Sequence, residues 1–334
     1  MAKSSIRIGI LGYGQSGRNA HALAGIQPNA EYQVTAVCDL SENNRQKAEE
    51  DFDCSTYADY QEMLERESLD AVSIITRSDT HCDIACAFLK GGVHAVVTKP
   101  WALNLEEADR ILDAADTGNA RVFPWIPMRW SPDYRKIQSL LEADAIGEVY
   151  AIRRYITNFF RRHDWQTELK YGGGYLLNWG MHIVQPVLDL AQSSVTRVYG
   201  RFNQVINPGD AEDNFVALLD FENGIQGTAE FTEAIEGLPW FMIQGTRGMI
   251  QSNDHTLTLI QVDPDHPTEQ KRQEFPLEGK MYGDEAEIYK DLASAILENQ
   301  PFGISPEEAH EGTRIIDAIR ESAQTHQAVV LKSS

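Results

Sequence analysis

The feature that most constrains this chain is a glycine-rich turn between a short apolar run and a helix-like segment. The run Ile6–Leu11 predicts a buried strand, and Gly12, Gly14 and Gly17 follow it with the spacing G-x-G-x-x-G. The first glycine permits a tight turn, the second lets a pyrophosphate approach the backbone, and the third lets a helix pack on the strand. We therefore predict a dinucleotide-binding turn; a turn that only packs is the alternative.

The first 120 or so residues alternate β-branched runs with helix-like segments, which is typical of a doubly wound parallel sheet. Asn104, followed three residues later by Glu107, predicts a capping box at the start of a surface helix. The pattern changes near residue 125, where Ser131-Pro132 predicts the start of a helix that Gly147 ends. The expected strands are residues 6–11, 32–38, 71–75, 93–97, 121–125 and 148–160.

The second half of the chain reads as successive strands over residues 195–260, with Asn223-Gly224 as a hairpin turn. Residues 263–280 are polar and predict an exposed excursion, after which two helices follow, the second opened by Ser305-Pro306. The chain is therefore predicted to be an α/β protein. We expect an N-terminal Rossmann doubly wound parallel sheet over residues 1–124 and a C-terminal α/β domain with a large, mostly antiparallel open sheet over residues 125–334.

Charge and cysteine usage exclude several classes of partner. The 334 residues carry 29 Lys plus Arg against 50 Asp plus Glu, a net charge of −21, which opposes binding to nucleic acid or anionic lipid. No apolar stretch approaches the roughly 18 residues of a membrane span, and residues 6–11 are too short for a signal peptide. The four cysteines lack metal-ligand spacing, so we expect core thiols in a reducing cytoplasm and no metal site: Cys38, Cys54, Cys82 and Cys86.

Asp39 follows the second expected strand, about twenty residues after the last glycine of the turn. A carboxylate there can accept hydrogen bonds from the adenosine ribose, and it would repel a 2′-phosphate. NAD is therefore favoured over NADP. Arg45 could supply a cation to NADP, but it reads equally well as a solvated helix residue. A strand-end cap is the alternative role of Asp39.

Two further segments carry candidate chemistry. Lys99-Pro100 ends the strand over residues 93–97, at the edge where doubly wound sheets bind ligands; without its neighbours Lys99 would read as a surface lysine. Residues 172–174 are three glycines whose backbone could lie close to a ligand, and apolar spacing after them predicts a helix. Asn178 and His182 share one face of that helix. His182 could act as a general base near neutral pH, or be a core histidine.

Taken together, these residues resemble the Gfo/Idh/MocA family, named after glucose-fructose oxidoreductase, inositol dehydrogenase and a rhizopine-catabolism protein. The likeness runs from about Ile6 to Leu331, and the order and spacing of its motifs are specific to the family. The motifs are the glycine turn, Thr80-His81, Lys99-Pro100, Arg129 with Pro132, Ile146-Gly147-Glu148-Val149, and residues 172–182.

The resemblance implies a dinucleotide-binding Rossmann domain over residues 1–124 and a substrate-binding and oligomerisation domain over residues 125–334. It also implies an NAD(P)-dependent dehydrogenase for a sugar, cyclitol or similar polyol, assembled as a homodimer or homotetramer. Lys99 matches the lysine that reaches nicotinamide and substrate, and His182 the proposed general acid or base. The expected cofactor contacts are Gly12, Tyr13, Gly14, Gln15, Ser16, Gly17, Asp39, Thr76, His81, Lys99 and Pro100.

Three positions depart from the family pattern. Thr98 stands where the family usually has Glu, Asn178 where it usually has Asp, and Arg77-Ser78 where a proline is common. Loss of the aspartate removes a negative charge, so the pKa of His182 is expected to be lower than in typical members. Asn178 can still donate and accept hydrogen bonds to a sugar hydroxyl, and we count it among the catalytic candidates.

The loop over residues 159–166 precedes the three glycines and carries aromatic, amide and charged side chains that suit a carbohydrate. Its two arginines also permit an acidic sugar or a phosphate. A loop that contacts another subunit is the alternative. The candidate substrate contacts are Trp101, Arg129, Arg161, Arg162, His163, Trp165, Asn178 and His182.

The leading hypothesis is oxidation of a secondary alcohol of a sugar, cyclitol or glycoside with NAD. His182 would take the hydroxyl proton and Lys99 would orient the hydroxyl. Two alternatives keep the fold: a redox-neutral, NAD-dependent glycoside-cleaving enzyme, and a non-catalytic dinucleotide-sensing regulator. The presence of both Lys99 and His182 favours an enzyme.

Overall fold

The computed structural model describes residues 5–233, 238–253 and 255–332. The chain forms two compact units. The first contains Met1–Ile126 and Asp284–His310, and the second contains Pro127–Gly283 and Glu311–Ser334. The sequence had placed everything after residue 124 in the second domain, whereas residues 284–310 return to the first unit. Among the described residues, none of the helices combines the length and apolar character needed to cross a bilayer.

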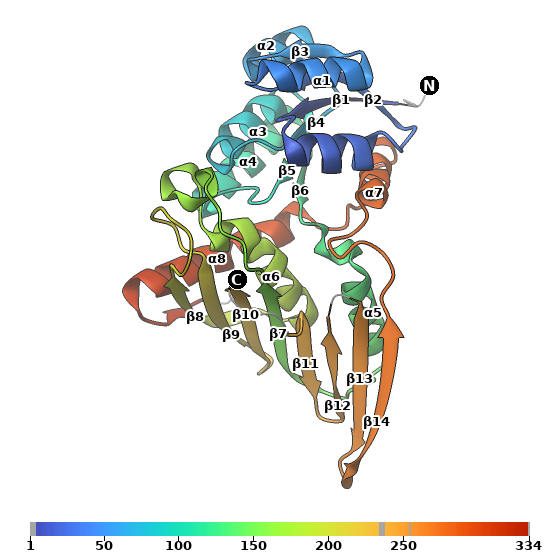
Figure 1. Cartoon of the computed structure of the whole chain (residues 1–334), viewed down its shortest axis with the longest axis vertical. Helices are drawn as coiled ribbons and strands as arrows, with labels where there is room; N and C mark the ends of the chain where they lie inside the picture. Colours follow the sequence, from blue (N-terminus) through green and yellow to red (C-terminus); the bar gives the residue numbers. More distant parts are fainter. Residues whose placement is uncertain (1–4, 234–237, 254, 333–334) are drawn as a thin grey trace. The chain divides into compact units, whose positions relative to one another are not determined.

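The first unit is built on a six-stranded parallel sheet, which confirms the predicted Rossmann arrangement (Figure 1). Its strand order is β3-β2-β1-β4-β5-β6. The strands are β1 (Ile6–Leu11), β2 (Tyr32–Cys38), β3 (Ser55–Tyr57), β4 (Ala71–Ile74), β5 (His94–Thr98) and β6 (Val122–Trp125). The sequence analysis missed only β3, because one exposed and two half-buried residues carry no apolar pattern.

Helix α4 (Leu105–Gly118) begins at the cap that the sequence predicts. At α4, the Asn104 side chain accepts a hydrogen bond from Glu107 N (2.9 Å). The Glu107 carboxylate accepts one from Leu103 N (2.9 Å), so the capping box forms with its second bond shifted by one residue. The helices are η1 (Gly17–Ile26), α1 (Glu42–Phe52), α2 (Tyr60–Arg66), η2 (Ser78–Thr80), α3 (His81–Lys90) and α4 (Leu105–Gly118).

Helix α7 (Glu285–Leu297) completes the first unit by packing on η1. Its fully buried Tyr289 bonds through its hydroxyl to His21 Nδ1 (2.9 Å) and Ser73 Oγ (2.8 Å). A Cβ at Gly25 of η1 would lie 2.4 Å from the Tyr289 ring, so this position requires glycine. The returning segment is thus part of the core of the first unit.

The second unit contains a nine-stranded sheet of order β14-β13-β12-β11-β7-β10-β9-β8-β15. Among the described strands of this sheet, only the β7–β10 pair is parallel, which confirms the expected mostly antiparallel sheet. The strands are β7 (Val149–Thr157), β8 (Val195–Asn203), β9 (Asn214–Phe221), β10 (Gln226–Thr232), β11 (Phe241–Gly245), β12 (Gly248–Ser252), β13 (Thr256–Asp263), β14 (His266–Pro276) and β15 (Val329–Val330).

Helix α6 packs on β7, β9 and β10, and α5 contacts β13 (Figure 1). The predicted Asn223-Gly224 hairpin joins β9 to β10 and is confirmed. The helices of the second unit are η3 (Pro127–Trp130), α5 (Pro132–Glu142), η4 (Trp165–Thr167), η5 (Leu169–Tyr171), α6 (Tyr175–Ala191) and α8 (Pro306–Thr325). The first residues of α8 belong to the first unit. Ser305 and Glu308 exchange capping bonds at the start of α8, as expected.

Two local predictions are corrected. Helix α5 ends at Glu142, before Gly147, because the chain turns through Asp144, which has a left-handed φ of 53°. The polar segment 263–280 is exposed as predicted, but residues 266–276 form β14 at the sheet edge. An edge strand exposed on both faces needs no apolar alternation, so the pattern did not reveal it.

Candidate functional site

The three glycines of the turn after β1 have different surroundings. A Cβ at Gly12, whose φ is +87°, would lie 2.3 Å from Ile75 O, and a Cβ at Gly17 would lie 1.9 Å from Gly12 O. Both glycines are therefore required by the fold itself. A Cβ at Gly14 meets nothing within 4 Å. The fold leaves Gly14 unexplained, and the open space beside it, next to exposed Gln15 and Ser16, fits the pyrophosphate of a dinucleotide.

Asp39 connects this turn to the end of β2. Its Oδ2 accepts a hydrogen bond from Tyr13 N (2.6 Å), and its Oδ1 accepts from Ser41 N (2.8 Å) and from Asn44 Nδ2 (3.2 Å). The carboxylate thus caps the strand end and fixes the turn, while four lone-pair sites leave capacity for a ribose hydroxyl. Arg45 is not merely solvated: its Nη1 donates to Asp39 O (2.7 Å) and Leu40 O (3.1 Å).

Tyr13 anchors the turn from the protein side. Its ring is buried, and its hydroxyl donates to Asp51 Oδ2 (2.7 Å), which also pairs with Arg18 Nε (2.7 Å). Burial, followed by the hydrogen bond to Asp51, raises the pKa of Tyr13. The side chain is therefore fixed within the protein, so the expected contact of Tyr13 with a cofactor would have to come from its backbone.

His81 joins the loops that follow β4 and β5. Its Nδ1 lies 2.8 Å from Pro100 O and its Nε2 lies 3.0 Å from Thr76 O. Burial lowers the pKa of His81. The bridge brings four of the expected cofactor positions, Thr76, His81 and the cis Lys99-Pro100 pair, to the carboxyl edge of the sheet.

Three residues that the sequence analysis singled out in these loops and at the end of β5 make contacts within the protein itself. Thr98 Oγ1 donates to Ile74 O (2.9 Å), so the residue that replaces the usual glutamate connects β5 to β4 by a side-chain hydrogen bond. Trp101 is only 1% exposed and belongs to the core. Arg77, the extra cation, pairs with Asp79 through Nε (2.6 Å) and Nη2 (2.8 Å).

In the second unit, the three consecutive glycines are explained by the protein's own packing. Gly172 ends η5 with a φ of +70°, and a Cβ at Gly173 would lie 2.6 Å from Glu168 O. Gly174 has a φ of +101°, and its Cβ would lie 2.5 Å from the Glu212 carboxylate. Glu212 Oε1 accepts from Leu176 N (3.0 Å) and so caps α6. These contacts account for all three glycines without a ligand.

His182 and Asn178 lie on α6, 5% and 7% exposed. Aromatic rings surround the histidine: its ring centroid is 5.8 Å from that of Trp179 and 6.0 Å from that of Tyr282. Trp240 extends this aromatic cluster, 5.9 Å from Tyr282. The sequence analysis singled out the segment that contains Trp179 but named none of the three rings as a site residue, because residues 240 and 282 are far from it in the chain and single aromatic residues carry no motif.

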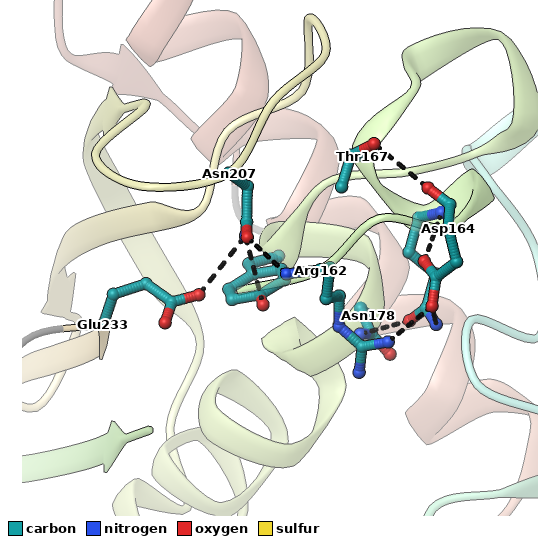
Figure 2. A network of polar contacts seen from close by, with 8 residues as sticks. Arg162, Asp164, Thr167, Asn178, Asn207 and Glu233 are labelled. Carbon is teal, nitrogen blue, oxygen red and sulfur yellow. Dashed lines mark hydrogen bonds and ion pairs between the residues drawn. The ribbon is translucent and has the colours of Figure 1, made fainter. Parts of the chain in front are cut away.

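The loop after β7 contacts Asn178 through a chain of polar side chains (Figure 2). Arg162 Nη1 donates to Asp164 Oδ2 (3.1 Å), Gln166 Nε2 donates to the same oxygen (3.4 Å), and Asn178 Nδ2 donates to Gln166 Oε1 (2.6 Å). Two predicted substrate residues, Arg162 and Asn178, are thereby linked. Arg161 and His163 are exposed on this loop, and Trp165 is half-buried.

The same loop is anchored at its start by a buried acid. Glu233, 1% exposed, accepts from Phe160 N (3.0 Å), and Asn207 Oδ1 accepts from Arg162 N (2.8 Å). Asn207 Nδ2 in turn contacts Glu233 Oε1 (3.4 Å) and the Tyr175 hydroxyl (3.3 Å) (Figure 2). Burial raises the pKa of Glu233, and burial together with Glu233 raises the pKa of Tyr175 to about 12.

Arg129, a predicted substrate contact, forms an ion pair within the second unit. Its Nε and Nη2 donate to Asp189 Oδ2 (2.8 Å) and Oδ1 (2.7 Å). Gln185 Nε2 also donates to Asp189 Oδ1 (2.8 Å). This bidentate geometry ties η3 to α6.

Comparison with known proteins agrees with this architecture. The family description "Oxidoreductase family, NAD-binding Rossmann fold" matches residues 6–124, and "GFO/IDH/MocA C-terminal domain" matches residues 134–251. The chain is 23% identical to Myo-inositol 2-dehydrogenase of Thermotoga maritima, over 98% of this chain and 99% of that protein. It is 22% identical to scyllo-inositol 2-dehydrogenase (NADP(+)) of Bacillus subtilis, over 98% and 96%.

Among solved structures, an NAD-binding protein from Listeria innocua matches with a TM-score of 0.87 at 26% identity, covering 98% of this chain and 97% of that one. The two family matches lie on the two units, and the similarity spans nearly the full length of the chain. The chain belongs to the Gfo/Idh/MocA family of NAD-binding oxidoreductases.

Proposed function

We propose that this protein is an NAD-dependent dehydrogenase that oxidises a secondary alcohol of a sugar, cyclitol or glycoside. The observation that carries the proposal is the turn after β1, where Gly12 and Gly17 are required by packing while Gly14 faces open space. A glycine that the protein does not need for its own fold is accounted for by a ligand that approaches its backbone. NAD, when bound, supplies the hydride acceptor.

Three residues of the chain perform the remaining chemistry in this proposal. His182 takes the hydroxyl proton, because an imidazole can be neutral near pH 7 and then return the proton. Lys99 orients the hydroxyl and stabilises negative charge that develops on its oxygen. Asn178, on the same face of α6 as His182, binds a substrate hydroxyl.

The aromatic cluster supports a carbohydrate or cyclitol as substrate. Trp179 and Tyr282 flank His182, and flat rings stack on the C–H faces of a saturated ring. Arg161, Arg162 and His163 add polar groups on the loop after β7, which also suits an acidic sugar. The inositol substrates in the names of two relatives support the cyclitol alternative within this class.

Asp39 supports NAD over NADP. A 2′-phosphate on the adenosine ribose would face this carboxylate, while Arg45 donates to the backbone oxygens of Asp39 and Leu40. The proposal also includes a cytoplasmic location and a homodimer or homotetramer. Size-exclusion chromatography with light scattering would test the oligomeric state.

The deciding experiment measures NAD and NADP reduction by absorbance against aldoses, inositols, uronic acids and glycosides. We expect one of these classes to reduce NAD faster than NADP. Cofactor binding without reduction of either cofactor would refute the dehydrogenase. In that case, glycoside cleavage with retained NAD would establish the redox-neutral enzyme, and its absence would favour a dinucleotide-sensing protein.

A further inference from the structure

The chain of hydrogen bonds from the loop after β7 to α6 has a fixed polarity. A carboxylate can only accept hydrogen bonds, so Asp164 Oδ2 must face the NH₂ group of Gln166, at 3.4 Å. This leaves Gln166 Oε1 facing Asn178, and the 2.6 Å contact is then a bond donated by Asn178 Nδ2. Asp164 therefore sets the orientation of the Asn178 amide through Gln166, which lies between them in this chain of hydrogen bonds.

We propose that Gln166 and Asp164 are positioning residues that hold Asn178 with its amide nitrogen toward the loop and its carbonyl oxygen turned away from Gln166, as an acceptor for a substrate hydroxyl. This inference rests on the proposed function, because it concerns how Asn178 binds a polyol. With the amide reversed, Asn178 would offer the substrate hydroxyl a donor in place of an acceptor.

The backbone around Gln166 holds this arrangement in place before any ligand arrives. Gln166 N donates to Asp164 Oδ1 (3.0 Å), and Gln166 O accepts from Gly174 N (2.9 Å), directly before α6. Arg162, whose N is bound by Asn207, donates its Nη1 to Asp164 (Figure 2). Both ends of the relay are thus fixed to backbone, which is what a preset substrate contact requires.

Two variants separate the polarity of Gln166 from its bulk. Gln166→Glu is made in an Asp164→Asn background throughout, so that an amide NH₂ and not a second carboxylate faces the new acid. It keeps an oxygen facing Asn178 Nδ2, whereas Gln166→Met has similar length and loses both amide functions. Gln261→Met is the matched control, because Gln261, which lies on β13, donates a comparable hydrogen bond from its Nε2 to Ala145 O (2.7 Å). We expect Gln166→Met to raise KM for the polyol about tenfold, as loss of roughly one hydrogen bond implies, with KM for NAD unchanged. Gln166→Glu should restore KM to within about threefold of wild type.

A second measurement is independent of turnover. The ¹⁵N–¹H₂ signals of the Asn178 side chain are identified by their loss in Asn178→Asp, and their exchange with water is measured. We expect exchange to quicken about tenfold in Gln166→Met and to stay slow in Gln166→Glu and Gln261→Met.

Equal exchange in wild type and Gln166→Met would overturn the relay, whether or not a substrate is known. An equal rise in KM for Gln166→Glu and Gln166→Met, with exchange slow in the former and fast in the latter, would also overturn the proposal. The orientation of Asn178 would then not matter for binding of the polyol. Absence of turnover in wild type would instead refute the proposed function, while the exchange measurement would still decide the orientation of Asn178.

Discussion

Replacing Gly14 and Gly17 with alanine, one at a time, separates a glycine needed by a ligand from a glycine needed by the fold. An alanine Cβ at position 14 meets nothing within 4 Å, whereas at position 17 it would lie 1.9 Å from Gly12 O. The backbone of Gly14 is not in the left-handed region, so alanine fits there without strain. The two variants are therefore expected to fail in different assays.

The magnitudes follow from these contacts. Gly14→Ala should leave the free energy of unfolding unchanged or raise it by up to about 1 kcal/mol, because alanine restricts the unfolded chain. The methyl group would displace a pyrophosphate from the backbone and cost at least one charge-assisted hydrogen bond, so the Kd for NAD should rise tenfold or more, on the order of 1.5–3 kcal/mol. Gly17→Ala must move backbone atoms and should destabilise the fold by roughly 1–3 kcal/mol or more.

Urea unfolding followed by circular dichroism measures stability, and isothermal titration with NAD measures affinity. An unchanged Kd for NAD in Gly14→Ala would refute the assignment of the open space to the pyrophosphate. A loss of more than about 1 kcal/mol of stability in the same variant would show that Gly14 serves the fold after all.

Three further substitutions test separate steps of the argument. Lys99→Ala should lower kcat at least about a hundredfold and change NAD affinity far less, as expected of a group acting mainly in the transition state; unchanged turnover removes Lys99 from the mechanism. Asp39→Asn removes the charge that would face a 2′-phosphate, so the preference for NAD over NADP in kcat/KM should fall about tenfold, and an unaltered ratio would assign that preference elsewhere. Burial lowers the pKa of His21 to about 3, so the folded protein keeps His21 neutral while the unfolded chain takes up a proton below pH 6.5. The free energy of unfolding should therefore decrease as the pH is lowered from 6.5 to about 3, by up to about 1.4 kcal/mol per pH unit. His21→Gln should flatten that slope in urea unfolding, and equal slopes in the variant and the wild type would contradict this role of His21.

Local sequence determined the elements whose signals lie within a few residues. The glycine turn after Ile6–Leu11, the Asn223-Gly224 hairpin and the caps at Asn104 and Ser305 all form where the sequence predicts them. Each is a short-range device in which one residue type satisfies one backbone need, so neighbouring residues suffice to recognise it.

Some residues belong to motifs that the sequence shows, but the contacts that explain these residues come from other parts of the chain. The glycines at 172–174 are adjacent to a predicted helix, but the atoms that exclude a side chain there belong to Glu168, Gln166 and Glu212. Arg129 is fixed by Asp189, sixty positions later. Sequence spacing identified these residues, but it could not say what they contact.

The sequence by itself therefore determined the fold class, the glycine turn and the helix that carries Asn178 and His182. Only the tertiary structure decided the return of α7 to the first unit, the aromatic rings of Trp179, Trp240 and Tyr282, and the link from Asp164 to Asn178. The physical reason is range. Helix starts and turns are stabilised by backbone bonds to near neighbours, whereas ring packing and side-chain relays depend on which distant segments the folded chain brings within a few ångströms.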